Sequence, residues 1–353
     1  MAVQDLVLHF IYDENSGDKQ FYIPGDILRG TIHLHLLRNL RVRSMTLLIL
    51  GGAAVSWEEQ AKKKLYTARE EYLQGSKILL DAGVDDSVEL QRGIHEFTFE
   101  YQLPSNLPST FSGVYGSVTY VAKCVLHPED DHSTTMTSEP FMVLRRPPLP
   151  PETYADQEMK ASKFFLGFLT AGQVKLQCRI SRSAAIPGEI IYVNAEVANW
   201  SPKGINLIQG AVILESTYYA QNAKDKKIAF RQILNKRIDV FDVKNLRGRR
   251  WRNVQMAIPP YLPDSELMNC AIMDVKYLFE FRAQIQGADD IFIHMPLYVG
   301  GQPVGYGDVA GQGPKNIDLD AFSGTFTNNE LPWYRGGGGV LTESVDGDMF
   351  DVR

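Results

Sequence analysis

One block of sequence occurs twice in this chain, and the duplication limits the folds open to it. Ile23-Pro24-Gly25-Asp26-Ile27 returns in the second half as Ile186-Pro187-Gly188-Glu189-Ile190. In each copy a Pro-Gly turn and an acidic residue lead into a strand-like alternation of apolar and polar residues. The strand Val118-Thr119-Tyr120 likewise returns as Val275-Lys276-Tyr277. Two copies of one unit in tandem are the simplest explanation.

Each copy reads as β structure. Residues 27–37 place Ile32, Leu34 and Leu36 on one face and His33 and His35 on the other. Residues 93–103 alternate in the same way, through Ile94, Phe97, Phe99 and Tyr101, and we expect this aromatic stripe to fill a core. Only residues 58–72 have helix propensity, which tertiary packing can override. The sequence predicts an all-β protein of two tandem immunoglobulin-like β-sandwiches.

The chain also shows where the two copies separate. Its 353 residues suit about two domains. The proline-rich run 145–151 has too few backbone donors to continue a sheet. After about Gly300 the composition becomes glycine-rich and polar, which is typical of a mobile tail. We therefore predict sandwiches at 1–145 and 165–303, a proline-rich linker at 146–164 and a flexible tail at 304–353.

Charge and cysteine content exclude several classes. A net charge of −6 provides no basic field for nucleic acid. The three cysteines, Cys124, Cys178 and Cys270, are an odd number without CxxC spacing, which argues against a disulfide framework and a zinc site and favours buried free thiols. The N-terminus lacks the features of a secretory signal, and no apolar run reaches the roughly 20 residues that a membrane-spanning helix needs. A cytoplasmic location is expected.

An ordered set of blocks resembles the α-arrestin, or arrestin domain-containing, family. In the first half these blocks are 22–26, 51–57, 93–99, 103–104, 107–113 and 116–121. In the second half they are 186–189, Asn199-Trp200-Ser201, 269–277 and 295–300. The resemblance runs through both halves in order. It implies the arrestin fold and an adaptor that binds other proteins, with no catalytic residues and no cofactor or metal.

What the resemblance implies about partners is more specific. Members of the family link membrane cargo, such as receptors and transporters, to endocytic sorting and to ubiquitin ligases, with recruitment from the cytoplasm to the plasma membrane and endosomes. A second interpretation is an arrestin-fold subunit of a sorting coat for endosomal protein retrieval. One family member binds thioredoxin through a reactive cysteine in its second domain. Residues 247–252 contain no cysteine here, and Cys270 matches an ordinary buried cysteine, which argues against a thioredoxin partner.

Ligase recruitment in this family uses proline-tyrosine motifs that bind WW domains as polyproline II segments. The usual Pro-Pro-x-Tyr is absent. Leu331-Pro332-Trp333-Tyr334 fits the Leu-Pro-x-Tyr variant and lies in the predicted tail, so Leu331, Pro332 and Tyr334 are the candidate WW-binding residues. The alternative is that Trp333 and Tyr334 pack back onto a sandwich.

Basic clusters are the other candidate binding sites. The densest contains Arg247, Arg249, Arg250 and Arg252, and Lys224, Lys226 and Lys227 form another. Such cations suit acidic or phosphorylated cargo tails or anionic lipid headgroups. The alternative is a solubilising surface. We select the four arginines as the candidate anion-binding and cargo-binding site.

Enzymatic and metal sites have weaker support. No GxSxG, HExxH or P-loop motif is present. His33 and His35 share a strand face and could bind a metal, although solvent-facing histidines are the simpler interpretation. The run from His127 through Pro128, Glu129, Asp130 and Asp131 to His132 could hold a divalent cation for an enzyme, but it suits a solvated turn better.

Overall fold

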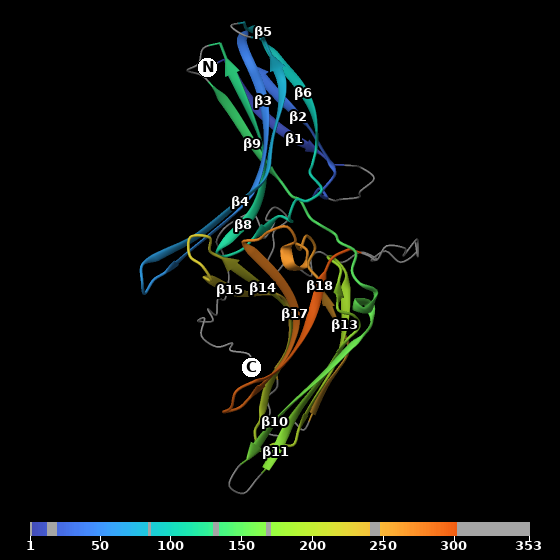
Figure 1. Cartoon of the computed structure of the whole chain (residues 1–353). Coiled ribbons are helices and arrows are strands. Elements are labelled where there is room, and N and C mark those ends of the chain that lie inside the picture. Colours follow the sequence, from blue (N-terminus) through green and yellow to red (C-terminus); the bar gives the residue numbers. More distant parts are fainter. Residues whose placement is uncertain are drawn as a thin grey trace. The chain divides into compact units, whose positions relative to one another are not determined.

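The computed structural model describes residues 2–12, 20–83, 86–129, 134–166, 171–240 and 248–301. Within these residues the regular structure is β-strand, apart from the short 3-10 helices Pro151–Tyr154 and Ser265–Leu267 (Figure 1). The all-β prediction is confirmed. The chain divides into two compact units. The first comprises Met1–Arg145, Tyr218–Lys226 and Leu267–Met273, and the remaining residues form the second.

The first unit contains two sheets. The smaller has the order β1-β2-β6 and the larger the order β4-β3-β8-β7, with β5 paired to β3 and β9 paired to β8. Their bounds are β1 Val3–Ile11, β2 Ile27–Leu36, β3 Leu40–Glu59, β4 Lys64–Asp81, β5 Val88–Leu90, β6 Gly93–Gln102, β7 Phe111–Ser112, β8 Gly116–Pro128 and β9 Thr135–Phe141.

Alternation places the core of the first unit between these sheets. Leu28, Ile32 and Leu34 of β2 are fully buried, as two-residue periodicity requires of one strand face. On β6 the stripe is less regular than predicted. Phe99 is buried, whereas Ile94 is 67% exposed because it lies on the opposite strand face.

The helix propensity of residues 58–72 is overridden. β3 runs to Glu59 and β4 starts at Lys64, so the two strands form a long antiparallel hairpin. Trp57 and Tyr66, which are directly opposite in the register, stack with ring centroids 5.3 Å apart. Cross-strand aromatic packing and a continuous ladder stabilise the strand more than local propensity stabilises a helix.

The second unit also contains two sheets. One has the order β10-β11-β13-β16 and is called the β10 sheet below; the other has the order β12-β18-β17-β14-β15. Their bounds are β10 Gln157–Leu166, β11 Ala171–Ile180, β12 Ala184–Ala185, β13 Ile190–Asn199, β14 Ile205–Tyr219, β15 Lys227–Val240, β16 Gly248–Ala257, β17 Met273–Ile285 and β18 Ile291–Val299. β10 begins at Gln157, inside the segment 146–164 that we predicted as a linker.

The duplicated turn has the same geometry in both units. Gly25 and Gly188 have φ of 95° and 86°, values that glycine adopts without strain. Asp26 N donates to Ile23 O at 2.9 Å, and Glu189 N donates to Ile186 O at 3.0 Å. These bonds close equivalent turns before β2 and β13.

The duplicated strand carries a matching contact. Tyr120 of β8 donates its hydroxyl to Pro108 O at 2.7 Å, and Tyr277 of β17 donates to Pro263 O at 2.9 Å. Both tyrosine side chains are buried. The two units therefore share a strand, a turn and a buried hydrogen bond at corresponding places.

Candidate protein-binding surface

The predicted arginine cluster lies on β16, the outer strand of the β10 sheet. Trp251 fixes this strand: its side chain is 4% exposed, and its indole Nε1 donates to Asp239 Oδ2 at 2.8 Å. Burial of Trp251 directs Arg250 and Arg252 to the opposite, outward face, because neighbouring residues on a strand face opposite ways. Arg249 shares the face of Trp251 and also contacts Asp239 Oδ2. Arg249, Arg250 and Arg252 are exposed, and Arg247 lies outside the described residues.

Carboxylates of the same unit neutralise much of this cluster. Arg250 Nη2 lies 2.7 Å from Glu196 Oε2 on β13, and Arg249 Nε lies 3.4 Å from Asp239 Oδ2 on β15. Such exposed pairs contribute little to stability, but they lower the charge available to an anionic ligand. The arginine site therefore stays a prediction, with Arg252 its least neutralised described member.

A hollow of about 400 Å³ lies on the outward face of the same sheet, and we call it the β10 hollow. β10, β11 and β13 supply the lining side chains, which include Lys160, Ser162, Lys175, Gln177, Glu196 and Trp200. The strand register explains the grouping. Ser162 lies opposite Lys175, and Lys160 lies opposite Gln177, which in turn lies opposite Glu196. Residues that are far apart in sequence thus form one surface.

The β10 hollow combines positive charge with an exposed indole. Lys175 Nζ lies 5.5 Å from the centroid of the Trp200 ring, and no described carboxylate pairs with this amine. Lys160 Nζ lies 3.1 Å from Glu158 Oε1. Beyond Trp200, which is 60% exposed, Phe164 and Leu166 are 71% and 90% exposed. This surface offers cations and apolar area to a protein ligand.

The sequence analysis did not select the residues of the β10 hollow. Lys160 and Ser162 fell within the predicted linker, and Trp200 was noted only as part of the family resemblance. Only a partial signal was present: Lys160 and Ser162 alternate with Met159 and Ala161, but Lys163 and Phe164 break the alternation. Strand pairing with β11, which brings Lys175 alongside Ser162, was not visible in the sequence.

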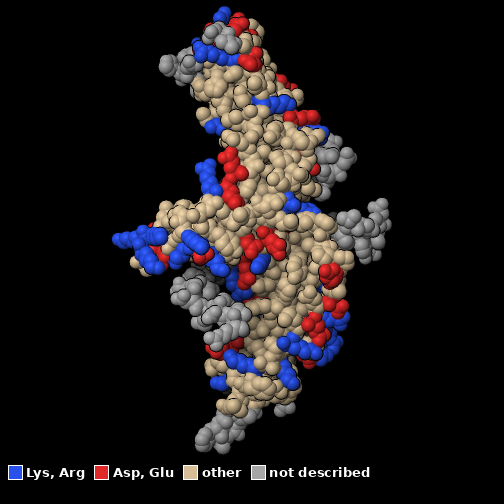
Figure 2. Space-filling view, viewed as in Figure 1, with Lys and Arg blue, Asp and Glu red and all other residues tan. Residues whose placement is uncertain are grey.

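Lysines gather at the end of the β3–β4 hairpin in the first unit, where Figure 2 shows a blue group on the left. Lys62 and Lys64 are part of this tip, and Lys226 of the same unit lies with Nζ 5.9 Å from the Tyr66 ring centroid. The Lys62 amine and the Tyr66 hydroxyl both donate to Glu59, and these hydrogen bonds lower the pKa of the Glu59 carboxyl. The tip carries more positive than negative charge.

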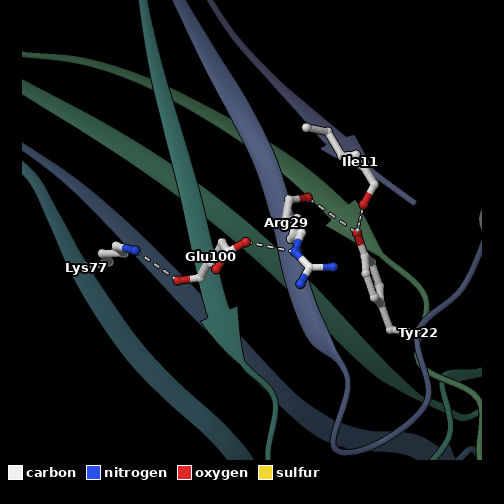
Figure 3. A network of polar contacts seen from close by, with 5 residues as sticks. All are labelled: Ile11, Tyr22, Arg29, Lys77 and Glu100. Carbon is white, nitrogen blue, oxygen red and sulfur yellow. Dashed lines mark hydrogen bonds and ion pairs between the residues drawn. The ribbon is translucent and has the colours of Figure 1, made fainter. Parts of the chain in front are cut away.

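A polar network in the first unit connects four strands (Figure 3). Tyr22 donates its hydroxyl to Ile11 O at 3.3 Å, and Arg29 Nε lies 2.8 Å from Glu100 Oε1. Lys77 Nζ of β4 donates to Glu100 O on β6 at 3.0 Å. The Lys77 bond links the two sheets at their edges, so we assign this network to stability.

The histidine candidates do not assemble a metal site in the described part of the chain, where no three His, Cys, Asp or Glu residues form a cluster suited to a metal ion. His33 Nδ1 lies 3.4 Å from Glu96 Oε1 across the strand pair. In the run from His127 to His132, Glu129 pairs with Arg41 at 3.7 Å, and Asp130, Asp131 and His132 lie outside the described residues.

The cysteines are free thiols. Cys124 and Cys178 are buried, and burial raises the pKa of each to about 12. Cys270 is half-buried, and burial raises its pKa as well. Protonated thiols are poor nucleophiles, so these cysteines suit packing.

The WW-binding motif and the membrane-spanning helix are the two remaining features that the sequence analysis considered. The WW-binding candidates Leu331, Pro332 and Tyr334 lie outside the described residues. Among the helices that are described, none has the length and apolar composition to cross a membrane.

Comparison with known proteins agrees with this architecture. Residues 9–147 match the model of the arrestin (or S-antigen) N-terminal domain, and residues 170–304 match the model of the arrestin (or S-antigen) C-terminal domain. Arrestin domain-containing protein 4 of Mus musculus is 27% identical over 318 residues, which cover 84% of this chain and 72% of that protein. The Homo sapiens protein of the same name is 26% identical over 343 residues, covering 91% and 77%. Arrestin domain-containing protein 1 of Mus musculus is 24% identical over 285 residues, covering 79% and 61%.

Two arrestin modules in series, each with the same turn and strand, define an arrestin-fold adaptor and not an enzyme. The chain belongs to the arrestin domain-containing family, the α-arrestins.

Proposed function

We propose that this α-arrestin is a cytoplasmic adaptor that binds the tails of membrane-protein cargo and links them to endocytic sorting at the plasma membrane and endosomes. The observation that carries the proposal is the pair of arrestin modules, matched over residues 9–147 and 170–304 in the order that arrestins have. The exposed Lys175 and Trp200 support it, because they provide charge and apolar area for a peptide.

Proximity labelling in cells tests this role. The full chain and a truncation after Gly300 are each fused to a labelling enzyme, and the labelled proteins are compared. Membrane receptors or transporters labelled by both forms support cargo binding by the modules. Labelling confined to subunits of a stable coat complex would contradict the cargo role and favour the sorting-coat interpretation.

Coupling to a ubiquitin ligase is the second part of the proposal. Leu331, Pro332 and Tyr334 fit a Leu-Pro-x-Tyr ligand of WW domains, and they fall in the predicted tail at 304–353. A pulldown with a purified WW domain compares the full chain with Tyr334→Ala. We expect Tyr334→Ala to lose binding; equal binding by both proteins eliminates the motif.

Attraction to anionic lipid headgroups is the third part. Arg249, Arg250 and Arg252 on β16 and Arg247 before it are the proposed contacts. Vesicles with and without phosphatidylserine separate this charge effect from general lipid binding. We expect reversal of Arg252 to glutamate to reduce sedimentation with phosphatidylserine vesicles. Unchanged sedimentation contradicts the assignment.

A further inference from the structure

One edge of β10 has no hydrogen-bonded partner strand in the described part of the chain. Within the described residues, β10 is the outermost strand of its sheet and pairs only with β11. β18 of the facing sheet runs near β10, and Lys163 Nζ of β10 donates to Asp289 O before β18 at 2.9 Å, but β18 is hydrogen-bonded to β17 and β12. An open edge presents a row of N–H and C=O groups to which another strand can pair.

The register identifies the residues whose backbone groups point to this edge. Ser181 N donates to Tyr192 O and Trp200 N donates to Gln173 O, each at 2.9 Å, so odd-numbered residues of β11 bond with β13. Even-numbered residues of β11 therefore bond with β10. Cys178 of β11 lies opposite Met159 of β10, so the even-numbered residues of β11 bond with the odd-numbered residues of β10. The remaining groups, those of Lys160, Ser162 and Phe164 among them, point away from β11.

Two other outer strands show how this protein protects an edge. On β6, Glu100 O accepts a hydrogen bond from Lys77 Nζ at 3.0 Å (Figure 3). On β16, Ala257 O accepts one from Asn235 Nδ2 at 2.9 Å. Among the described residues, no side chain makes a corresponding bond to the edge groups of Lys160, Ser162 or Phe164. Among the described residues these edge groups of β10 therefore have no hydrogen-bond partner.

The side chains beside this edge differ between the two faces of the strand. On the outward face, Lys160 and Ser162 line the β10 hollow together with Lys175. On the other face, Met159 remains 43% exposed and Phe165 is half-buried, so their apolar surface is only partly covered. A strand added at the edge would extend both faces.

We propose that the β10 edge and the β10 hollow bind an extended segment of a partner protein by β-strand addition. Anionic side chains at alternate positions of the segment lie on the outward face, beside Lys160 and on the same side of the sheet as Lys175. The intervening apolar side chains cover Met159 and Phe165. Backbone pairing provides affinity and the alternating side chains provide selectivity. The identification of the segment as a cargo tail rests on the proposed adaptor function, whereas the binding itself does not.

Charge complementarity selects an anionic segment. Lys175 has no described carboxylate partner, and Glu158 engages the neighbouring Lys160 at 3.1 Å. An anionic group on an added residue opposite Ser162 would lie beside Ser162 and diagonal to Lys160, with Lys175 on the same face one strand further in, opposite Ser162. Aspartate, glutamate and phosphoserine all supply this chemistry.

The first experiment measures peptide binding to the full chain by fluorescence anisotropy. The probe is a labelled ten-residue peptide that alternates glutamate and valine, and matched peptides carry glutamine or phosphoserine in place of glutamate. We expect the glutamate peptide to bind at least ten-fold more tightly than the glutamine peptide. Tighter binding of the phosphoserine peptide would identify phosphorylated segments as the preferred source. Equal binding of glutamate and glutamine peptides, or binding of neither, overturns the proposal.

The second experiment separates strand addition from attraction by surface charge. Ser162→Pro removes an N–H that points to the open edge and leaves the β10–β11 ladder intact, since proline is tolerated at an outward-facing edge position. Ser162→Ala is the matched control, because it keeps the N–H. We expect Ser162→Pro to weaken binding of the glutamate peptide at least ten-fold and Ser162→Ala to leave it unchanged. Full binding by a folded Ser162→Pro protein overturns strand addition.

Hydrogen exchange tests strand addition in the unmodified chain, so this test does not depend on whether Ser162→Pro folds. Saturation with the glutamate peptide should slow exchange of the amides of Lys160, Ser162 and Phe164, and leave those of β15 unchanged. Bound peptide without this protection overturns the proposal. Proximity labelling with Ser162→Pro then connects the site to cargo. If labelling of cargo persists while the peptide site is lost, cargo binds elsewhere and the adaptor function stands without this inference.

Discussion

Tyr120 and Tyr277 each contribute one buried hydrogen bond to a carbonyl that has little access to water. Replacement of either by phenylalanine keeps the ring and leaves the carbonyl of Pro108 or Pro263 unpaired, which costs about 1–3 kcal/mol. We expect Tyr120→Phe and Tyr277→Phe to lower stability by similar amounts, in the first and second unit respectively. Calorimetry of the full chain measures this loss. Tyr192→Phe, at a 43% exposed position, is the control and should have no effect.

Burial of Cys124 and Cys178 predicts that their thiols react slowly with alkylating reagents. With a pKa of about 12, Cys124 and Cys178 are thiolate at only about one part in 10,000 at pH 8, and their side chains are enclosed. We expect iodoacetamide to leave both unmodified in the native protein and to label both in guanidinium, as peptide mass spectrometry would show. Rapid native labelling of Cys124 would contradict its burial.

The raised pKa of Cys124 and Cys178 also predicts how the stability of the fold depends on pH. Burial raises the pKa of these thiols from the ordinary value of 9.0 to about 12, so folding favours the neutral form. Their contribution to stability is complete below pH 9. It is lost as the pH rises from about 9 to 12, because the unfolded chain then releases protons that the folded chain retains.

At the scale of the element, β3 contains a glycine that the packing requires. A Cβ on Gly51 would overlap the ring of Tyr120, which is 1% exposed on the adjacent strand β8. We expect Gly51→Ala to destabilise the first unit by about 1–3 kcal/mol, because overpacking forces the ring or the strand to move. Chemical denaturation measures the change. Ala54→Ser, at an exposed position of the same strand, should be neutral; an equal loss in both variants would contradict the packing argument.

Strands and turns were readable from the sequence wherever the signal is local. The alternation around Ile32 and the Pro-Gly turn at Gly25 depend on neighbouring residues alone, and both are confirmed. Residues 58–72 were ambiguous because Trp57 and Tyr66 stack only once the hairpin has formed. β10 was hidden in the predicted linker since its pairing with β11 gives the ladder that local composition does not reveal.

The candidate sites were even harder to predict than the strands, because they depend on contacts between residues that are far apart in the sequence. Arg249, Arg250 and Arg252 were selected because they are dense along the chain, whereas the carboxylates that neutralise two of them come from β13 and β15. The β10 hollow has no dense run to reveal it. Lys160, Lys175 and Trp200 come from three different strands and meet only through the register of the sheet.

At the scale of the whole molecule, the two units are not two uninterrupted stretches of chain. Tyr218–Lys226 and Leu267–Met273 belong to the first unit, although they flank strands of the second. Within the first unit, Thr67 N donates to Asn222 Oδ1 at 3.0 Å, and Arg69 N donates to Gln221 Oε1 at 2.9 Å. The first unit therefore depends on residues that the chain supplies after the start of the second.

Replacement of Tyr218 tests whether the first unit depends on residues from later in the chain. It is fully buried and packs edge-to-face on Tyr115, with ring centroids 5.6 Å apart within the first unit. Removal of a buried aromatic side chain costs about 3–5 kcal/mol, so we expect Tyr218→Ala to destabilise the first unit and to speed hydrogen exchange in residues 111–120. Tyr219→Ala is the matched control, because the neighbouring ring is 37% exposed. Exchange that stays slow in residues 111–120 would mean that residues 1–145 form their core without help from the second half of the chain. In that case a single cut between Arg145 and Arg146 would yield a stable first module. The packing of Tyr218 predicts the opposite: the fragment should melt at a lower temperature than the first unit does in the full chain.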